Sequence, residues 1–110
     1  MENHRRVLEF EVDKQRLHKK SGCDFKGLVA GSKNYLIAKF YLSRDEWDEC
    51  RVAASFWING EEHPVILDQD NACVIPPEVL TGRTFRCSLT GMRNDYIIKT
   101  NRIAVRQEVS

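Results

Sequence analysis

The chain has 110 residues, of which 42% are hydrophobic and 30% are charged, and its formal net charge is +1. This length supports one hydrophobic core, and the apolar fraction excludes a disordered chain. The near-neutral charge disfavours nucleic acid as a partner, because proteins that bind a phosphate backbone carry a basic excess on at least one face.

The N-terminal segment differs from the rest of the chain. Residues 1–6 are polar and are expected to form a flexible end, and residues 7–110 are expected to form one domain. The polar start predicts no secretory signal, and therefore a protein that is made in the cytoplasm. No apolar run reaches the length of a membrane span, so membrane insertion is not expected.

Two strands are predicted in the first half of the chain. Leu8, Phe10 and Val12 alternate with acidic residues, which is the period of a strand with one buried face. Residues 15–33 contain glycines among polar residues and predict a long connection with a short extended piece inside it. Residues 34–43 are the clearest strand. One side of it carries Leu36, Ala38, Phe40 and Leu42, and the other carries Tyr35, Ile37, Lys39 and Tyr41.

The second half begins with a compact acidic turn or a single helical turn over residues 44–49 around Trp47. Residues 51–58 and 62–67 then predict a hairpin, because Asn59-Gly60 between them supports the positive φ angles of a tight turn. The other predicted strands cover residues 72–75, which Pro76-Pro77 ends, and residues 83–90, 95–100 and 102–109.

Seven or eight short strands at this spacing predict an all-β fold, an antiparallel β-sandwich that is Ig-like or a partly open barrel. No helical period persists over three turns, so a fold of alternating strands and helices is disfavoured. The side chains expected in the core are Phe10, Phe40, Trp47, Phe56 and Phe85.

The sequence contains no recognisable catalytic constellation, and no cofactor or metal is expected. None of the three histidines lies in a metal or catalytic motif. The acids of residues 45–49 lack the spacing of a calcium-binding loop, and we expect them to solubilise the turn. No C-x-x-C pair is present. We expect free thiols, although a disulfide remains an open alternative for Cys23, Cys50, Cys73 and Cys87.

An outer apolar patch is the main candidate for an interface. Strand alternation sends Trp57 away from the core, as it does Tyr35, Ile37 and Tyr41. If the two strands that carry them pair, the four side chains form one exposed patch of the kind that marks contact surfaces. A covering second layer or the long connection is the alternative, and stacking of a sugar on Trp57 is a third.

The order of short motifs resembles a known family. V-L-E-F-E-V-D is followed by V-A-G-S-K-N-Y-L-I-A-K-F, D-E-W-D, N-G, V-I-L-D, V-I-P-P-E-V-L, T-F-R-C-S-L-T-G and I-K-T-N-R-I-A-V. The series, which covers about Val7 to Val105, is similar to the N-terminal β-sandwich domain of tail and baseplate structural proteins, such as baseplate upper proteins, in phages and prophages of Gram-positive bacteria.

The resemblance implies a non-enzymatic building block that attaches larger parts to the tail tip. It implies that Trp47 matches a tryptophan of the family, whereas Trp57 stands at a position where the family is expected to have a polar residue. Other tail and baseplate proteins are then the expected partners, with a homo-oligomer as a further option. The expected locations are the virion tail and, during assembly, the host cytoplasm. The relatives continue beyond the sandwich, so the chain is expected to be either a small virion protein or an excised domain. A carbohydrate-binding module that recognises a host surface glycan is the alternative function.

Overall fold

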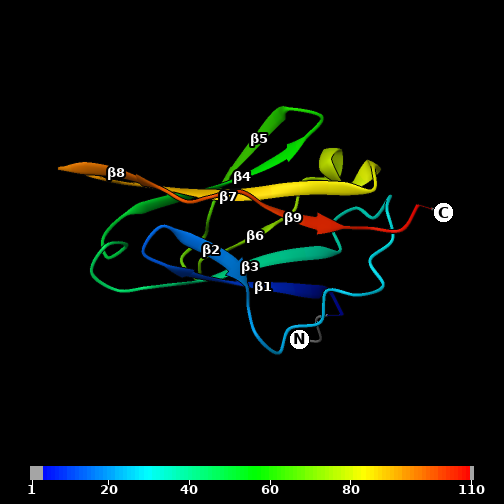
Figure 1. Cartoon of the computed structure of the whole chain (residues 1–110), viewed down its shortest axis with the longest axis horizontal. Coiled ribbons are helices and arrows are strands. Elements are labelled where there is room, and N and C mark those ends of the chain that lie inside the picture. The colour runs from blue at the N-terminus through cyan, green and yellow to red at the C-terminus, as the bar shows by residue number, and fades with distance from the viewer. Residues whose placement is uncertain (1–3, 110) are drawn as a thin grey trace.

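Two β-sheets pack face to face in the computed structural model, which describes residues 4–109 (Figure 1). The elements in chain order are β1 (Arg6–Asp13), β2 (Arg16–Lys19), β3 (Leu36–Leu42), β4 (Arg51–Ile58), β5 (Glu61–Ile66), β6 (Ala72–Val74), the 3-10 helix η1 (Pro77–Thr81), β7 (Thr84–Arg93), β8 (Tyr96–Lys99) and β9 (Ile103–Arg106). The predicted all-β sandwich is confirmed, and β2 is the extended piece expected in the long connection.

One sheet has the strand order β2-β1-β3-β6. The other has the order β5-β4-β7, and β8 and β9 both pair with β7, each along one half of it. The β4–β5 hairpin turns at Asn59-Gly60 as predicted, with positive φ angles of 50° and 79°. The long β7 therefore joins three strands and forms the centre of the five-stranded sheet.

The pairing of β1 with β3 differs from the predicted antiparallel arrangement, because these two strands are parallel, with Phe10 opposite Phe40. A parallel pair needs a long crossover connection, and the segment between β2 and β3 supplies it.

The N-terminal end of the described chain also differs from the prediction. Arg6 begins β1, and its guanidinium donates to the carbonyls of Asp24 and Lys26 at 2.8 and 2.7 Å, so a flexible end is wrong at this residue. Residues 1–3 lie outside the described part of the chain.

The core lies between the two sheets, and all five side chains expected there are buried, with exposed fractions of 0 to 3%. Phe10 stacks on Phe40 with 5.0 Å between ring centroids, and Phe25 from the connection meets Phe10 edge-on at 5.4 Å. Phe56 and Phe85 face each other from β4 and β7 at 6.3 Å. Burying a side chain of this size contributes roughly 1.5–3 kcal/mol, so these rings hold the sheets together.

Trp47 joins the two sheets at one end of the sandwich. Its Nε1 donates to the Lys14 carbonyl at 2.8 Å, in the turn between β1 and β2, and its ring lies against Gly91 of β7. A Cβ at Gly91 would stand 2.8 and 2.9 Å from two ring carbons of Trp47. The close approach of the indole therefore requires glycine at this position.

We expect Gly91→Ala to lower the free energy of unfolding by about 1–3 kcal/mol, because the added methyl overpacks the contact with Trp47. Urea denaturation measures this change. Gly82→Ala is the matched control, since its Cβ would lie an ordinary 3.5 Å from Ile58 Cδ1. The same unfolding midpoint for both variants would contradict the close packing of Trp47 on Gly91.

The open edges of the sheets are partly guarded. Asn101 holds β2 through both of its amide atoms: Oδ1 accepts from the Leu17 N–H at 2.7 Å, and Nδ2 donates to the Leu17 carbonyl at 3.2 Å. On β5, Pro64 interrupts the row of backbone donors, and proteins use proline in this way against edge-to-edge pairing. Contacts through the sheet faces are therefore favoured over strand addition.

Candidate functional site

The predicted patch of four apolar residues is not one surface. Ile37 and Tyr41 lie on β3 with Tyr35 just before it, whereas Trp57 lies on β4, and these strands belong to different sheets. The alternation correctly predicted which side chains point away from the core. The assumed pairing of β3 with β4 is wrong. The interface candidates are therefore divided between the two outer faces of the sandwich.

The outer face of the four-stranded sheet is largely polar around Tyr41. The Tyr41 hydroxyl donates to Glu9 at 2.6 Å, and the ammonium groups of Lys20 and Lys39 lie 5.3 and 5.4 Å from the ring centroid. The hydrogen bond to Glu9, together with burial, raises the pKa of Tyr41. Ile37 lies four residues before Tyr41 on the same face, between Val7 and Val74. The Tyr41 ring is therefore already in contact with polar and charged neighbours.

Trp57 is half-buried on the outer face of the five-stranded sheet and is already in contact with two polar side chains. Its Nε1 donates to the Ser88 hydroxyl at 3.2 Å, and the Arg102 guanidinium lies 3.5 Å from the centre of the indole. Beside it, the buried Ser55 donates to the Glu62 carboxylate. One face of the indole is thus covered by a cation.

Cations dominate this outer face. The strand register directs Arg86 of β7 outward beside Trp57, and Arg106 of β9 outward opposite Thr84. Among the described residues, Glu62 is the one acidic residue at an outward strand position of the five-stranded sheet. No carboxylate among residues 4–109 forms an ion pair with Arg86 or Arg106. The basic residues of this face are Arg51, Arg86, Lys99, Arg102 and Arg106.

A hollow of about 310 Å³ lies at one end of the same face. We call it the basic cleft. Its lining consists of Trp57, Ile58, Asn59, Gly60, Thr84, Arg86 and Arg102. Two guanidinium groups beside an indole can bind a carboxylate or another anion through charge-assisted hydrogen bonds.

Exposed aliphatic side chains gather at the other end of the face. Ile66, Met92 and Ile97 have exposed fractions of 69%, 54% and 62%. Met92 is paired with Ile97 across β7 and β8, and Ile66 is paired with Ala53 across β5 and β4. A hollow of about 320 Å³ lies between Ile66 and Met92. We call Ala53, Ile66, Met92 and Ile97 the apolar patch. Large contiguous patches of this kind mark contact surfaces.

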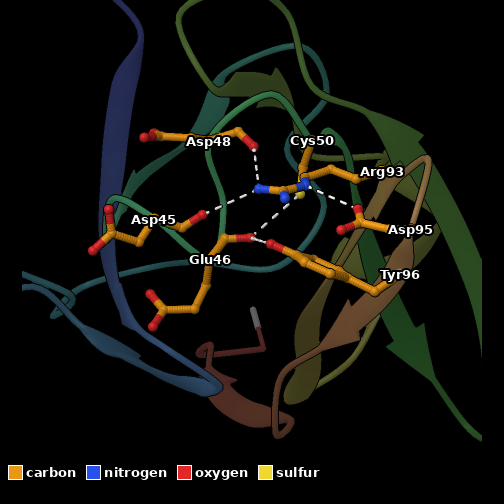
Figure 2. A network of polar contacts seen from close by, with 7 residues as sticks. All are labelled: Asp45, Glu46, Asp48, Cys50, Arg93, Asp95 and Tyr96. Atoms are coloured by element: carbon orange, nitrogen blue, oxygen red, sulfur yellow. Dashed lines mark hydrogen bonds and ion pairs between the residues drawn. The ribbon is translucent and has the colours of Figure 1, made fainter.

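The turn at residues 44–50 is held rigidly against the β7–β8 hairpin. Arg93 Nη1 donates to the carbonyls of Asp45 and Asp48 at 3.3 Å each, and its Nε donates to Asp95 at 3.3 Å (Figure 2). The Tyr96 hydroxyl donates to the Glu46 carbonyl, and the Arg93 guanidinium lies 4.5 Å from the Tyr96 ring centre.

The acidic side chains of this turn play no part in that clasp, whereas the Cys50 thiol donates to the Glu46 carbonyl at 3.5 Å. Figure 2 shows the carboxylates of Asp45, Glu46 and Asp48 directed away from the Arg93 guanidinium, which their backbone oxygens face. The hydrogen bond to Asp95 raises the pKa of Arg93. Of the two expected forms, residues 44–49 adopt the compact turn and not a single helical turn, since they form turns and a bend. No group of His, Cys, Asp and Glu in the described ranges is arranged to hold a metal ion.

All four cysteines are free thiols, and two of them are buried between the sheets. Burial raises the pKa of Cys73 to about 12, and it raises the pKa of Cys87 as well. Burial also raises the pKa of Cys50, which remains partly accessible. Because the thiolate is the reactive form, buried thiols with a raised pKa should be inert in the native protein.

We expect two of the four thiols, those of Cys23 and Cys50, to react with a thiol reagent at pH 8 in the native protein. All four should react in denaturant, which exposes Cys73 and Cys87. Counting labelled cysteines by mass spectrometry after short exposure checks this. Rapid labelling of Cys87 in the native protein would contradict its burial between the sheets.

No family model matches the sequence, and no curated protein matches it. Among the described residues there is no helix with the length and apolar character needed to cross a membrane.

Sequence reasoning missed the two features that distinguish the outer face of the five-stranded sheet. The basic cleft and the apolar patch are each assembled from strands distant in sequence. Residues 91–94 were expected to lie between two strands, but β7 runs through to Arg93 and so carries Met92 on this face. The alternation of Arg86, Ser88, Thr90 and Met92 along β7 was the available signal.

Proposed function

We propose that the chain is a non-enzymatic structural protein of a phage or prophage tail or baseplate, where it acts as an assembly or adaptor module. The order of sequence motifs supports the tail context. The confirmed β-sandwich is consistent with that proposal, and the partners it implies are other tail and baseplate proteins, not nucleic acid or a membrane.

The observation that carries an assembly role is the apolar patch. Ile66, Met92 and Ile97 are each more than half exposed on one sheet face, where water contact with aliphatic groups is unfavourable. Interfaces between proteins bury such residues in their centres and surround them with polar ones. Arg51 and Lys99 provide this polar rim at the same end of the face.

Gold-labelled antibody against the chain, applied to purified particles and viewed by negative-stain electron microscopy, tests the proposal. Label at the tail tip is the expected result. Particles that lack the gene for the chain are the control for antibody specificity. The absence of label from every virion structure would contradict the tail assignment.

The carbohydrate-binding alternative is less well supported, because Arg102 covers one face of the Trp57 ring against which a sugar would stack. We expect no glycan-array signal that depends on Trp57. Binding to a surface glycan that Trp57→Ala abolishes would favour the alternative over the assembly module.

A further inference from the structure

The molecule carries two surfaces of opposite charge whose ionic groups form no ion pairs within residues 4–109. The first is the acidic loop, which we define as Asp45, Glu46, Asp48 and Glu49. Residues 44–49 contain these four acids and one arginine, so their formal charge is −3. Glu46 accepts a long hydrogen bond from Ser43 at 3.5 Å, and the other three residues are exposed. The clasp around Arg93 fixes the backbone of the loop and leaves the carboxylates facing outward (Figure 2).

The second surface is the basic cleft. Arg86 and Arg102 are both exposed there, and neither forms an ion pair within the described part of the chain. Arg106 lies outward on the neighbouring β9. Holding these guanidinium groups close together costs free energy because they repel each other, and binding of an anionic partner offsets that repulsion. Because Arg102 is already stacked on Trp57, it loses little conformational freedom when such a partner binds.

These two surfaces cannot satisfy each other within one molecule. The acidic loop precedes Arg51 at the start of β4, whereas Trp57 and the basic cleft lie at the end of that strand. Six residue steps along a strand correspond to about 20 Å. Figure 1 places the segment between β3 and β4 at one end of the sandwich and η1 with the end of β9 toward the other.

We propose that the acidic loop of one copy of this chain docks into the basic cleft of a second copy. This head-to-tail contact rests on the proposed function and names the mode of assembly. A contact between two different surfaces leaves each copy with one free acidic loop and one free basic cleft. It therefore repeats, and it generates a ring if the rotation closes or an open chain if it does not.

The occupant is a protein loop and not a nucleic acid for two reasons. Proteins that bind single-stranded nucleic acid stack bases on free aromatic faces, and Arg102 occupies the face of Trp57 that it covers. The basic face also continues into the apolar patch, which suits a protein partner and offers nothing to a sugar-phosphate chain.

Charge reversal at each surface tests the contact. The cleft variant is Arg86→Glu with Arg102→Glu, and the loop variant is Asp48→Lys with Glu49→Lys. Mass in solution is measured by light scattering at low salt and at about 1 M salt, where charges more than about 3 Å apart are screened. Lys26→Glu with Lys33→Glu makes the same charge change as the cleft variant, on the exposed connection, and is the control.

We expect the wild type and the control to gain mass with concentration at low salt and to return to 12.8 kDa at high salt. Each charge-reversed variant alone should remain at 12.8 kDa, with a circular dichroism spectrum like that of the wild type. An equimolar mixture of the two variants should again gain mass, to a dimer or beyond, because the intact loop of one copy fits the intact cleft of the other and the reversed loop is complementary in charge to the reversed cleft.

A wild type that stays monomeric at low salt would overturn the contact, and so would a mixture of variants that never forms the dimer. Binding of a labelled single-stranded oligonucleotide that depends on Arg86 and Arg102, without self-association, would replace it with a nucleic-acid surface. Tail labelling is an independent result. Label on the tail together with a monomeric chain removes the head-to-tail contact and leaves the proposed function in place.

Discussion

Replacing Trp47 with alanine is expected to lower the free energy of unfolding by roughly 3–5 kcal/mol, the usual cost of removing a buried aromatic side chain. Trp47 is 3% exposed, its ring fills the space above Gly91, and its Nε1 donates to the Lys14 carbonyl. Alanine removes the ring and leaves that carbonyl without its partner. A domain of this size has little stability to spare, so the variant should unfold at much lower urea concentration.

Trp57→Ala is the matched control, because it makes the same change at a half-buried position on an outer face. We expect it to cost roughly 1 kcal/mol, chiefly through the lost hydrogen bond to Ser88. Equal unfolding midpoints for the two alanine variants would mean that the assignment of Trp47 to the core and of Trp57 to the surface is wrong.

Phe10→Ala is expected to have an effect of similar size, roughly 3–5 kcal/mol. Phe10 is fully buried, stacks on Phe40, and meets the ring of Phe25 from the long connection. Its loss leaves a cavity between the sheets and also removes the ring that Phe25 of that connection contacts. Amide exchange in residues 20–35 should therefore accelerate more than exchange in β7.

Phe10→Leu preserves most of the buried volume and should cost clearly less than the alanine variant. Tyr41→Ala, on the outward side of the adjacent β3, controls for loss of an aromatic ring outside the core. A Phe10→Ala protein whose connection exchanges as slowly as that of the wild type would show that Phe25 is held by something other than Phe10.

The alternation of residues was enough to predict the strands and the core. The alternation of apolar and polar residues indicates that one side of each strand is buried, as at Phe10, Phe40, Phe56 and Phe85. The Asn59-Gly60 turn follows from the backbone preferences of these two residues. Each of these signals depends on neighbours in sequence. They can therefore be identified without knowing which strands pair.

The surfaces could not be predicted in the same way, because alternation does not say to which sheet a strand belongs. Tyr41 and Trp57 both point away from the core, yet they lie on different faces. Conversely, Arg86 and Arg102 are 16 positions apart in sequence and line the same cleft, since β9 turns back onto β7. A net charge of +1 over the whole chain conceals that local concentration of cations.

The amount of the chain in assembled particles tests most directly whether the outer face of the five-stranded sheet makes the contacts of a tail protein. Quantitative mass spectrometry would compare particles that carry the wild type with particles that carry Met92→Thr with Ile97→Thr in the apolar patch. Val29→Thr with Tyr35→Thr changes two exposed apolar residues elsewhere and is the control. Threonine preserves strand propensity on β7 and β8.

We expect the apolar-patch variant to be depleted from particles about tenfold, the effect of losing about 1.4 kcal/mol of contact free energy, while the control is present at the wild-type level. Wild-type levels of the apolar-patch variant, with depletion of the control instead, would contradict the account and assign the contact to another face.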